Sequence, residues 1–410
     1  MTLRSAKAER IFWYDLLRLA AIFAVVCSHL SGYAFDDAAG MSAGMAVVRA
    51  VYSAAADFCV PALVMISGAM LLRGDRPLSI RRLYLRKILR LVTALAFWLC
   101  AYALVAAARE HGASSPAFWP AALDRLVHEH FHLWYMYMII GLYAISPLLR
   151  AICERESTRR YFLLLWLALG VVPATIHTFC PWLDVRLEAW RLDMWGNDKL
   201  SLGMVTGYAG YMVLGLQLSR RPPGRRARRA LYALAACMQL LSVLSILWMT
   251  YSQPDPHRFV LSAQNPCALN NAIYAAAVFT FFQHCFAASP RSALVRRGVT
   301  VAAQLSFGVY LMHDFANLLV STSPALSALV AAFPPVTLPL VAVGEFLLSM
   351  AAVALLALLP GSQFILGEAA LALRRPARPG RAKKYAPSLS LTARADRLEE
   401  YQWRFPAGGA

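Results

Sequence analysis

Long apolar runs constrain the fold of this chain more than any other feature. Each run extends over roughly 20 residues, which is enough to cross the hydrocarbon core of a bilayer as an α-helix. In lipid a helix satisfies its own backbone hydrogen bonds, and none of the runs alternates in the manner of a membrane β-strand. The ten runs cover residues 11–33, 46–72, 88–108, 131–152, 161–180, 200–219, 230–250, 268–289, 299–321 and 336–360.

The composition excludes a soluble domain. Of the 410 residues, 59% are hydrophobic and only 15% are charged, whereas soluble domains are about half apolar and about one quarter charged. One soluble core of this size could not bury so much apolar surface. We therefore expect an all-α, polytopic membrane bundle with about ten transmembrane helices.

The charges indicate how the bundle is oriented. Lys and Arg number 40 against 22 Asp and Glu, and 32 of the 40 fall in the two terminal segments and in every second loop. Basic residues collect on the cytoplasmic side of membrane proteins, so we expect both termini inside and no nucleic-acid partner. The expected divisions are a cytoplasmic N-terminus at 1–10, a membrane domain at 11–360 and a basic, mobile cytoplasmic tail at 361–410.

Ionisable residues inside the apolar runs are candidate functional groups, because they are costly to place in lipid. Asp15, Arg18 and His29 share one face of the first run, since Arg18 and His29 are eleven residues apart and only about 20° apart around the helix. Their separation along the axis is about 16 Å. An ion pair between Asp15 and Arg18, with a structural hydrogen bond at His29, is the alternative to a functional role.

A second intramembrane histidine, His313, lies at a depth comparable to that of His29. Asp57 and Glu345 are also placed inside apolar runs, and we interpret them as partners of the functional groups. The segment 128–132 reads HEHFH. On a helix this spacing would turn His130 away from His128 and His132, and no carboxylate-rich run stands beside it, so we expect no metal site.

Several segments resemble the acyltransferase-3 family of integral membrane O-acyltransferases. Asp15, Arg18 and His29 match the family's Asp-Leu-x-Arg segment and the histidine eleven residues beyond its arginine. The resemblance extends over about residues 10–360, although Leu63 and Val64 replace the usual paired phenylalanines and Asp314 stands where the family often has Pro. The segments that carry it are RIFWYDLLRLAAIFAVVCSHL (10–30), VPALVMISGAMLL (60–72), LRKILRL (85–91), HLWYMYMIIGLYAISPLL (132–149), GYMVLGLQLS (210–219) and GVYLMHDF (308–315).

The resemblance implies an enzyme of the bacterial inner membrane that moves acetyl, or another short acyl group, from acyl-CoA to a hydroxyl. The acceptor would be a cell-surface polysaccharide or a lipid-linked sugar, and acetyl-CoA would be a cosubstrate with no permanently bound cofactor. His29 would be the general base, with His313 as the second catalytic candidate. The other roles implied are donor binding by Arg18, Arg86, Lys87 and Arg90, and support of the site by Asp15, Asp57, Ser67, His132, Trp134 and Glu345.

Two other functions fit the same sequence. A proton-coupled transporter or flippase for a glycan or lipid precursor would use His29, His313 and Glu345 as a proton relay. A membrane scaffold or sensor would use its buried charges only to specify packing. Within the acyltransferase hypothesis, a covalent acetyl-imidazole relay is the alternative to direct transfer.

Overall fold

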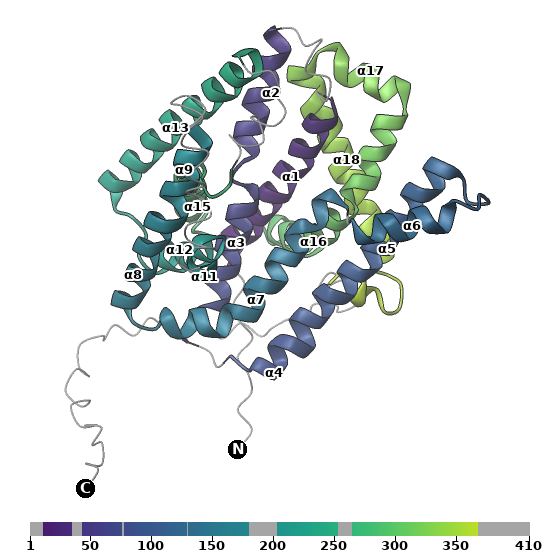
Figure 1. The fold of residues 1–410 in the computed structure, drawn as a ribbon. Helices are drawn as coiled ribbons and strands as arrows, with labels where there is room; N and C mark the ends of the chain where they lie inside the picture. Colours follow the sequence, from purple (N-terminus) through teal and green to yellow (C-terminus); the bar gives the residue numbers. More distant parts are fainter. Residues whose placement is uncertain are drawn as a thin grey trace, which may run out of the picture. The chain divides into compact units, whose positions relative to one another are not determined.

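The computed structural model describes residues 11–34, 43–75, 78–128, 130–179, 203–252 and 265–367, and every regular element in these ranges is a helix (Figure 1). The expected all-α fold is therefore confirmed for this part of the chain. The N-terminal segment 1–10 and residues 368–410 of the expected tail lie outside the described residues.

The helices follow the apolar runs closely. The long elements are α1 (Phe12–Ala34), α2 (Ala43–Ala56), α3 (Cys59–Leu71), α5 (Leu89–His111), α7 (Trp134–Ile152), α8 (Glu156–Trp166), α12 (Ala209–Arg220), α13 (Arg225–Ser252), α15 (Leu269–Cys285), α16 (Ala293–Thr322) and α18 (Pro334–Leu356). Shorter elements are α4 (Ile80–Leu83), η2 (Tyr84–Ile88), α6 (Phe118–Val127), η3 (Phe131–Leu133), η4 (Leu167–Val171), α9 (Val172–Phe179), α11 (Gly203–Thr206), α17 (Pro324–Ala332) and η8 (Ser362–Phe364).

Seven helical segments in the described residues are long and apolar enough to span a membrane. The protein is thus a multi-pass membrane protein, while the expected number of about ten spans is met only in part. Two of the other apolar runs form helices that are short for a span, because α12 has 12 residues and α15 has 17, against the roughly 20 that a bilayer requires.

Two apolar runs that we expected to be continuous are interrupted. The second run breaks at Asp57 and Phe58, between α2 and α3, and the sixth breaks at Gly207 and Tyr208, between α11 and α12. The segment between the third and fourth apolar runs contains the amphipathic helix α6. Periodicity finds apolar stretches, but it does not show where a polar residue or a glycine ends a helix within one.

Helix α1 is surrounded by other helices, so its polar residues lie inside the bundle. It packs against α2, α3, α15, α16 and α18, and its residues Leu17, Ala21 and Val26 are fully buried. The outward faces of the surrounding helices remain apolar, with exposed side chains such as Leu104 on α5 and Leu348 on α18. This pattern is typical of a bundle in lipid, where the outer surface need not be polar.

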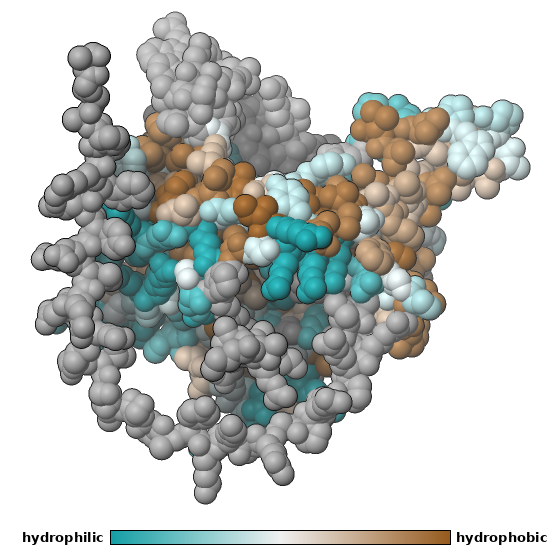
Figure 2. Space-filling model, turned by 90° about the horizontal axis from the view of Figure 1, so that it is seen from below, coloured by the Kyte–Doolittle hydropathy of each residue, from teal (hydrophilic) through white to brown (hydrophobic). Residues whose placement is uncertain are grey.

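Hydrophilic side chains gather on the face of the molecule that is seen from below in Figure 2. This face carries the lower ends of α1, α3, α4 and α12 in Figure 1. Its exposed basic side chains include Arg73, Arg81, Arg82, Arg86 and Arg220.

Helices α3 and α12 cross at backbone contact, and glycines make the crossing possible. A Cβ placed on Gly68 of α3 would lie 2.0 Å from the carbonyl oxygen of Met212. A Cβ placed on Gly215 of α12 would lie 2.1 Å from the carbonyl oxygen of Met65. Small residues permit such close approach in membrane bundles, where dispersion contacts rather than hydrophobic burial drive helix association.

We expect Gly68→Ala to destabilise the bundle by about 1–3 kcal/mol, because the added methyl group would force two backbones apart. Thermal unfolding of the purified protein in detergent measures the effect. Gly141→Ala on α7 is the matched control, since its site is exposed and has no atom within 4 Å of the new Cβ. Equal melting temperatures of the two variants would contradict this account of the crossing.

Candidate functional site

Helices α1 and α16 bring two histidines side by side. The rings of His29 and His313 have their centroids 5.1 Å apart. His313 is fully buried, while His29 is only partly buried. The two residues are 284 positions apart in the sequence, and the packing of α1 on α16 joins them.

His132, which the sequence analysis placed among the supporting residues, lies next to this pair. Its ring centroid is 5.2 Å from that of His313 and 6.4 Å from that of His29. The hydroxyl of Tyr310 on α16 donates a hydrogen bond of 2.5 Å to the carbonyl oxygen of His132. This bond fixes the η3 segment against α16, so that three helical elements contribute to one cluster.

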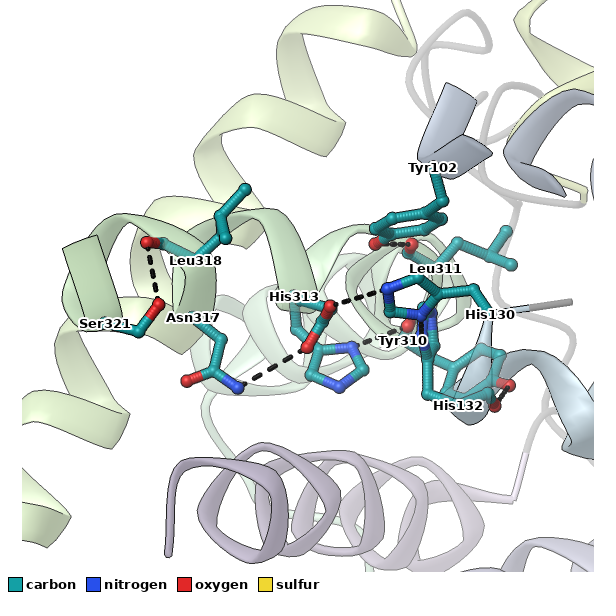
Figure 3. A network of polar contacts seen from close by, with 10 residues as sticks. Tyr102, His130, His132, Tyr310, Leu311, His313, Asn317, Leu318 and Ser321 are labelled. Atoms are coloured by element: carbon teal, nitrogen blue, oxygen red, sulfur yellow. Dashed lines mark hydrogen bonds and ion pairs between the residues drawn. The ribbon is translucent and has the colours of Figure 1, made fainter. Parts of the chain in front are cut away.

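A fourth histidine, His130, completes the cluster and connects it to Asp314 (Figure 3). Its Nε2 lies 3.3 Å from Oδ2 of Asp314, and its Nδ1 lies 2.8 Å from Nδ1 of His132. We name His29, His130, His132 and His313 the histidine cluster. Sequence reasoning missed His130, because it assumed helical spacing for a segment whose backbone is extended at His130 (φ −79°, ψ 132°).

The same geometry brings three possible metal ligands together, although we expected no metal site from the sequence. Ligand atoms of His130, His132 and Asp314 lie within 4.8 Å of one another, close enough for the three side chains to hold one metal ion. The carboxylate of this group is that of Asp314 on α16, which is far from His130 and His132 in the sequence. His130 joins the other two side chains, because it contacts the carboxylate of Asp314 through Nε2 and the ring of His132 through Nδ1.

Hydrogen bonds assign the proton on His313. Its Nδ1 lies 2.6 Å from the carbonyl oxygen of Tyr310. Because a carbonyl oxygen only accepts, Nδ1 carries the hydrogen and Nε2 presents its lone pair. This Nε2 is buried and has no hydrogen-bond partner within the described ranges. The site therefore holds a neutral imidazole with a free basic nitrogen.

The side-chain contacts that run from Asp314 through His130 to His132 orient the ring of His132 in the same way. A carboxylate accepts the hydrogen of His130 Nε2, which leaves His130 Nδ1 to accept from His132 Nδ1. His132 then presents its Nε2 lone pair, and that atom is likewise buried without a partner among the residues described. Buried polar atoms without partners are uncommon, so two such nitrogens in one cluster mark a place where a ligand would donate a hydrogen bond.

Aromatic rings frame the cluster on the side of α5. Tyr102 stacks on Phe315 with a centroid distance of 4.3 Å and an interplanar angle of 10°. The same tyrosine lies 4.2 Å from the ring of His130 and donates a hydrogen bond to the carbonyl oxygen of Leu311. On the α1 side, the ring of Phe131 lies 5.1 Å from that of His29.

The remaining candidates divide into two groups. Glu345 on α18 is buried, both of its carboxylate oxygens have no hydrogen-bond partner in the described structure, and it interacts electrostatically with Asp314. It therefore belongs to the surroundings of the histidine cluster. Asp57 lies instead at the break between α2 and α3, where it interacts electrostatically with Cys59 and Tyr274.

The polar residues of the first turns of α1 contact different helices. Asp15 is buried and accepts a hydrogen bond of 3.5 Å from the hydroxyl of Thr300 on α16. Arg18 is partly buried, and its Nη2 lies 4.0 Å from the sulfur of Met70 on α3. Arg18 lies eleven residues before His29 on α1, closer to the start of the helix.

The basic residues of η2 and of the start of α5 lie near the lower surface of the bundle. Arg86 is exposed, Arg90 is partly buried, and Nζ of Lys87 lies 5.8 Å above the ring of Tyr143. Ser67 is partly buried on α3, beside the tight crossing at Gly68. Trp134, at the start of α7, is 39% exposed and packs on Tyr208.

One comparison with known proteins identifies the chain. Residues 11–360 match the sequence profile Acyl_transf_3, described as an acyltransferase domain. No curated protein and no solved structure matches the chain.

Proposed function

Because the chain belongs to the acyltransferase-3 family, and is thus a membrane enzyme that transfers an acyl group, we propose a specific reaction for it. The enzyme moves an acetyl or other short acyl group from acyl-CoA to a hydroxyl of a cell-surface polysaccharide or lipid-linked sugar. It resides in the bacterial inner membrane, with both termini and the basic loops in the cytoplasm. The family assignment favours this enzyme over the transporter and scaffold alternatives.

The observation that carries the proposal is the histidine cluster. A sugar hydroxyl must lose a proton as it attacks a thioester, and a neutral imidazole is suited to accept it. His29 is the only member of the cluster that lies on α1 with Arg18, about 16 Å along the helix axis from it. The slender pantetheine arm of an acyl-CoA can extend over that distance.

The proposed transfer has one addition and one elimination. The hydroxyl oxygen bonds to the thioester carbon while His29 takes its proton, and the carbonyl oxygen becomes an oxyanion. The oxyanion then re-forms the carbonyl as the carbon–sulfur bond breaks. The departing thiolate takes the proton from His29, so the products are the acyl ester and free CoA.

His313 and His132 support this step from behind His29. Their protonated nitrogens are held by Tyr310 and His130, so their free nitrogens face the cluster. Those nitrogens are buried, and their role is to stabilise the positive charge that develops on His29. Asp15, Asp57, Ser67, Trp134 and Glu345 keep their proposed supporting roles in the surrounding helices.

A direct experiment tests the reaction. Membranes containing the protein are incubated with labelled acetyl-CoA and with surface glycan from cells that lack the gene. Mass spectrometry of the glycan should find an acetyl-sized mass increase that depends on the protein. Uptake of glycan driven by a proton gradient, without any acetylation, would support the transporter instead.

The donor-binding role proposed for Arg18, Arg86, Lys87 and Arg90 leads to a kinetic prediction. Replacing Arg18 by Ala should raise the apparent KM for acyl-CoA about tenfold, because a charge-assisted hydrogen bond to a donor oxygen is lost. Arg18→Lys should restore only part of the affinity, since an ammonium lacks the planar fork of the guanidinium. Initial rates at limiting acyl-CoA measure both effects. An unchanged KM would mean that Arg18 does not bind the donor and only packs between helices.

A further inference from the structure

A second polar site lies at the lower end of α1, well away from the histidine cluster. It is a cavity of about 310 Å³ between the ends of α1, α3, α12 and α15. Its polar and aromatic lining includes Trp13, Tyr14, Arg73, Ser219, Arg220 and Gln283. We name it the Arg73–Arg220 pocket. None of the residues proposed above for donor binding lines it.

Two arginines meet at this pocket. Nη2 of Arg220 lies 3.7 Å from the position that a Cβ would take on Gly74, directly after Arg73 in the chain. Both arginine side chains are exposed at the lower surface. The carboxylate of Asp75 also lines the cavity, 3.7 Å from Arg73 Nε. Two guanidinium groups outweigh this one carboxylate, so the cavity attracts an anion. Their planar forks match the geometry of phosphate oxygens.

The other side of the pocket has the chemistry of a nucleobase site. The rings of Trp13 and Tyr14, whose centroids are 4.0 Å apart, line the pocket. Both residues are buried, so a base contacts only the small part of each ring that faces the cavity. The amide of Gln283 donates to the carbonyl of Leu218, and its own oxygen is buried without a partner among the described residues. That oxygen can accept a hydrogen bond from an exocyclic amino group, such as that of adenine.

The helical spacing of α1 places Tyr14, which lines the pocket, on the same side of the helix as His29. Tyr14, Arg18 and His29 lie within about 60° of one another around α1, because they are separated by four and eleven residues. The axial distance from Tyr14 to His29 is about 22 Å. A ligand anchored at Tyr14 could therefore extend a narrow arm past Arg18 to the cluster.

We propose that the Arg73–Arg220 pocket binds the adenine nucleotide end of the acyl-CoA donor. The phosphates contact Arg73 and Arg220, and the base lies against Trp13 and Tyr14 near Gln283. This inference rests on the proposed function, because it takes acyl-CoA as the donor. It adds a nucleotide site that is distinct from the basic residues of η2 and of the start of α5.

Binding of CoA itself tests the proposal without turnover, because CoA carries no acyl group. The purified protein is placed in lipid discs of phosphatidylcholine, and CoA and adenosine 3′,5′-bisphosphate are titrated by calorimetry. Both ligands should bind, and Arg73→Gln or Arg220→Gln should raise each Kd about tenfold or more. Asp75→Asn should lower Kd about two- to fivefold, because Asp75 Oδ2 lies 3.7 Å from Arg73 Nε and competes for it.

The Asp75→Asn variant distinguishes a lost ligand contact from misfolding, since a misfolded protein would not bind CoA more tightly. Arg229→Gln is the charge-matched control, because Arg229 is exposed on α13 and does not line the pocket. It should bind CoA as the unaltered protein does.

Three other outcomes would overturn the proposal. If CoA binds and both arginine variants keep full affinity, the pocket assignment is wrong while the proposed function stands. If the unaltered protein binds no CoA, the donor class itself is wrong. If phosphatidylglycerol in the discs displaces the nucleotide competitively, and Arg73→Gln removes that competition, the pocket belongs to a lipid headgroup.

Discussion

His29→Gln should lower the rate of acyl transfer by about 10²–10⁴-fold, the usual loss when a general base is removed. Glutamine retains a side chain that can hydrogen-bond in the space between Phe131 and His313. It cannot take up a proton from the acceptor hydroxyl at neutral pH. The rate is measured in membranes with saturating acetyl-CoA and acceptor glycan, and the KM for the donor should change little.

His128→Gln serves as the control for this variant. His128 is a histidine of the same protein, its side chain is 72% exposed, and its nearest carboxylate is Asp124 at 3.2 Å. It should transfer acyl groups at the unaltered rate. A His29→Gln enzyme that works as fast as the His128→Gln enzyme would remove His29 from the reaction.

The helical class of this protein could be predicted from its sequence because lipid leaves few alternatives. A run such as 336–360 must be helical in a bilayer, and α18 begins at Pro334 and ends at Leu356. The breaks could not be predicted in this way. At Asp57 a partly buried side chain with one buried carboxylate oxygen coincides with a break in the helix, and at Gly207 the chain turns between α11 and α12. Both depend on neighbouring helices that a local pattern does not describe.

The site could be anticipated only where helical geometry decides the outcome. The shared face of Arg18 and His29 follows from their spacing on one helix, and the similar depth of His313 follows from counting residues along another. The contact of His130 with Asp314 follows from neither, because it joins an extended segment before α7 to α16. The one clue in the sequence was Asp314 itself, a carboxylate directly after a buried histidine.

His313→Gln should lower kcat about 10–100-fold, which is the effect expected for a lost hydrogen bond to a charged group. The imidazole of His313 donates to Tyr310 and presents Nε2 toward the cluster. A glutamine amide could still donate to Tyr310, but its oxygen is a far weaker base than the Nε2 of an imidazole and stabilises a protonated His29 less. The loss should therefore fall on kcat and leave CoA binding unchanged, because the Arg73–Arg220 pocket lies at the other end of α1.

The relative size of the two losses decides which histidine takes the proton. His29 is partly exposed and can be reached by an acceptor, whereas His313 is completely buried behind it. A general base must lie within hydrogen-bond reach of the proton that it removes, so the variant of His29 should be the slower enzyme. If His29→Gln is active and His313→Gln is inactive, the acceptor must reach α16 directly, and the two roles are exchanged. If both variants are active, the cluster serves only to hold α1 against α16, and the chemistry must be sought elsewhere in the bundle.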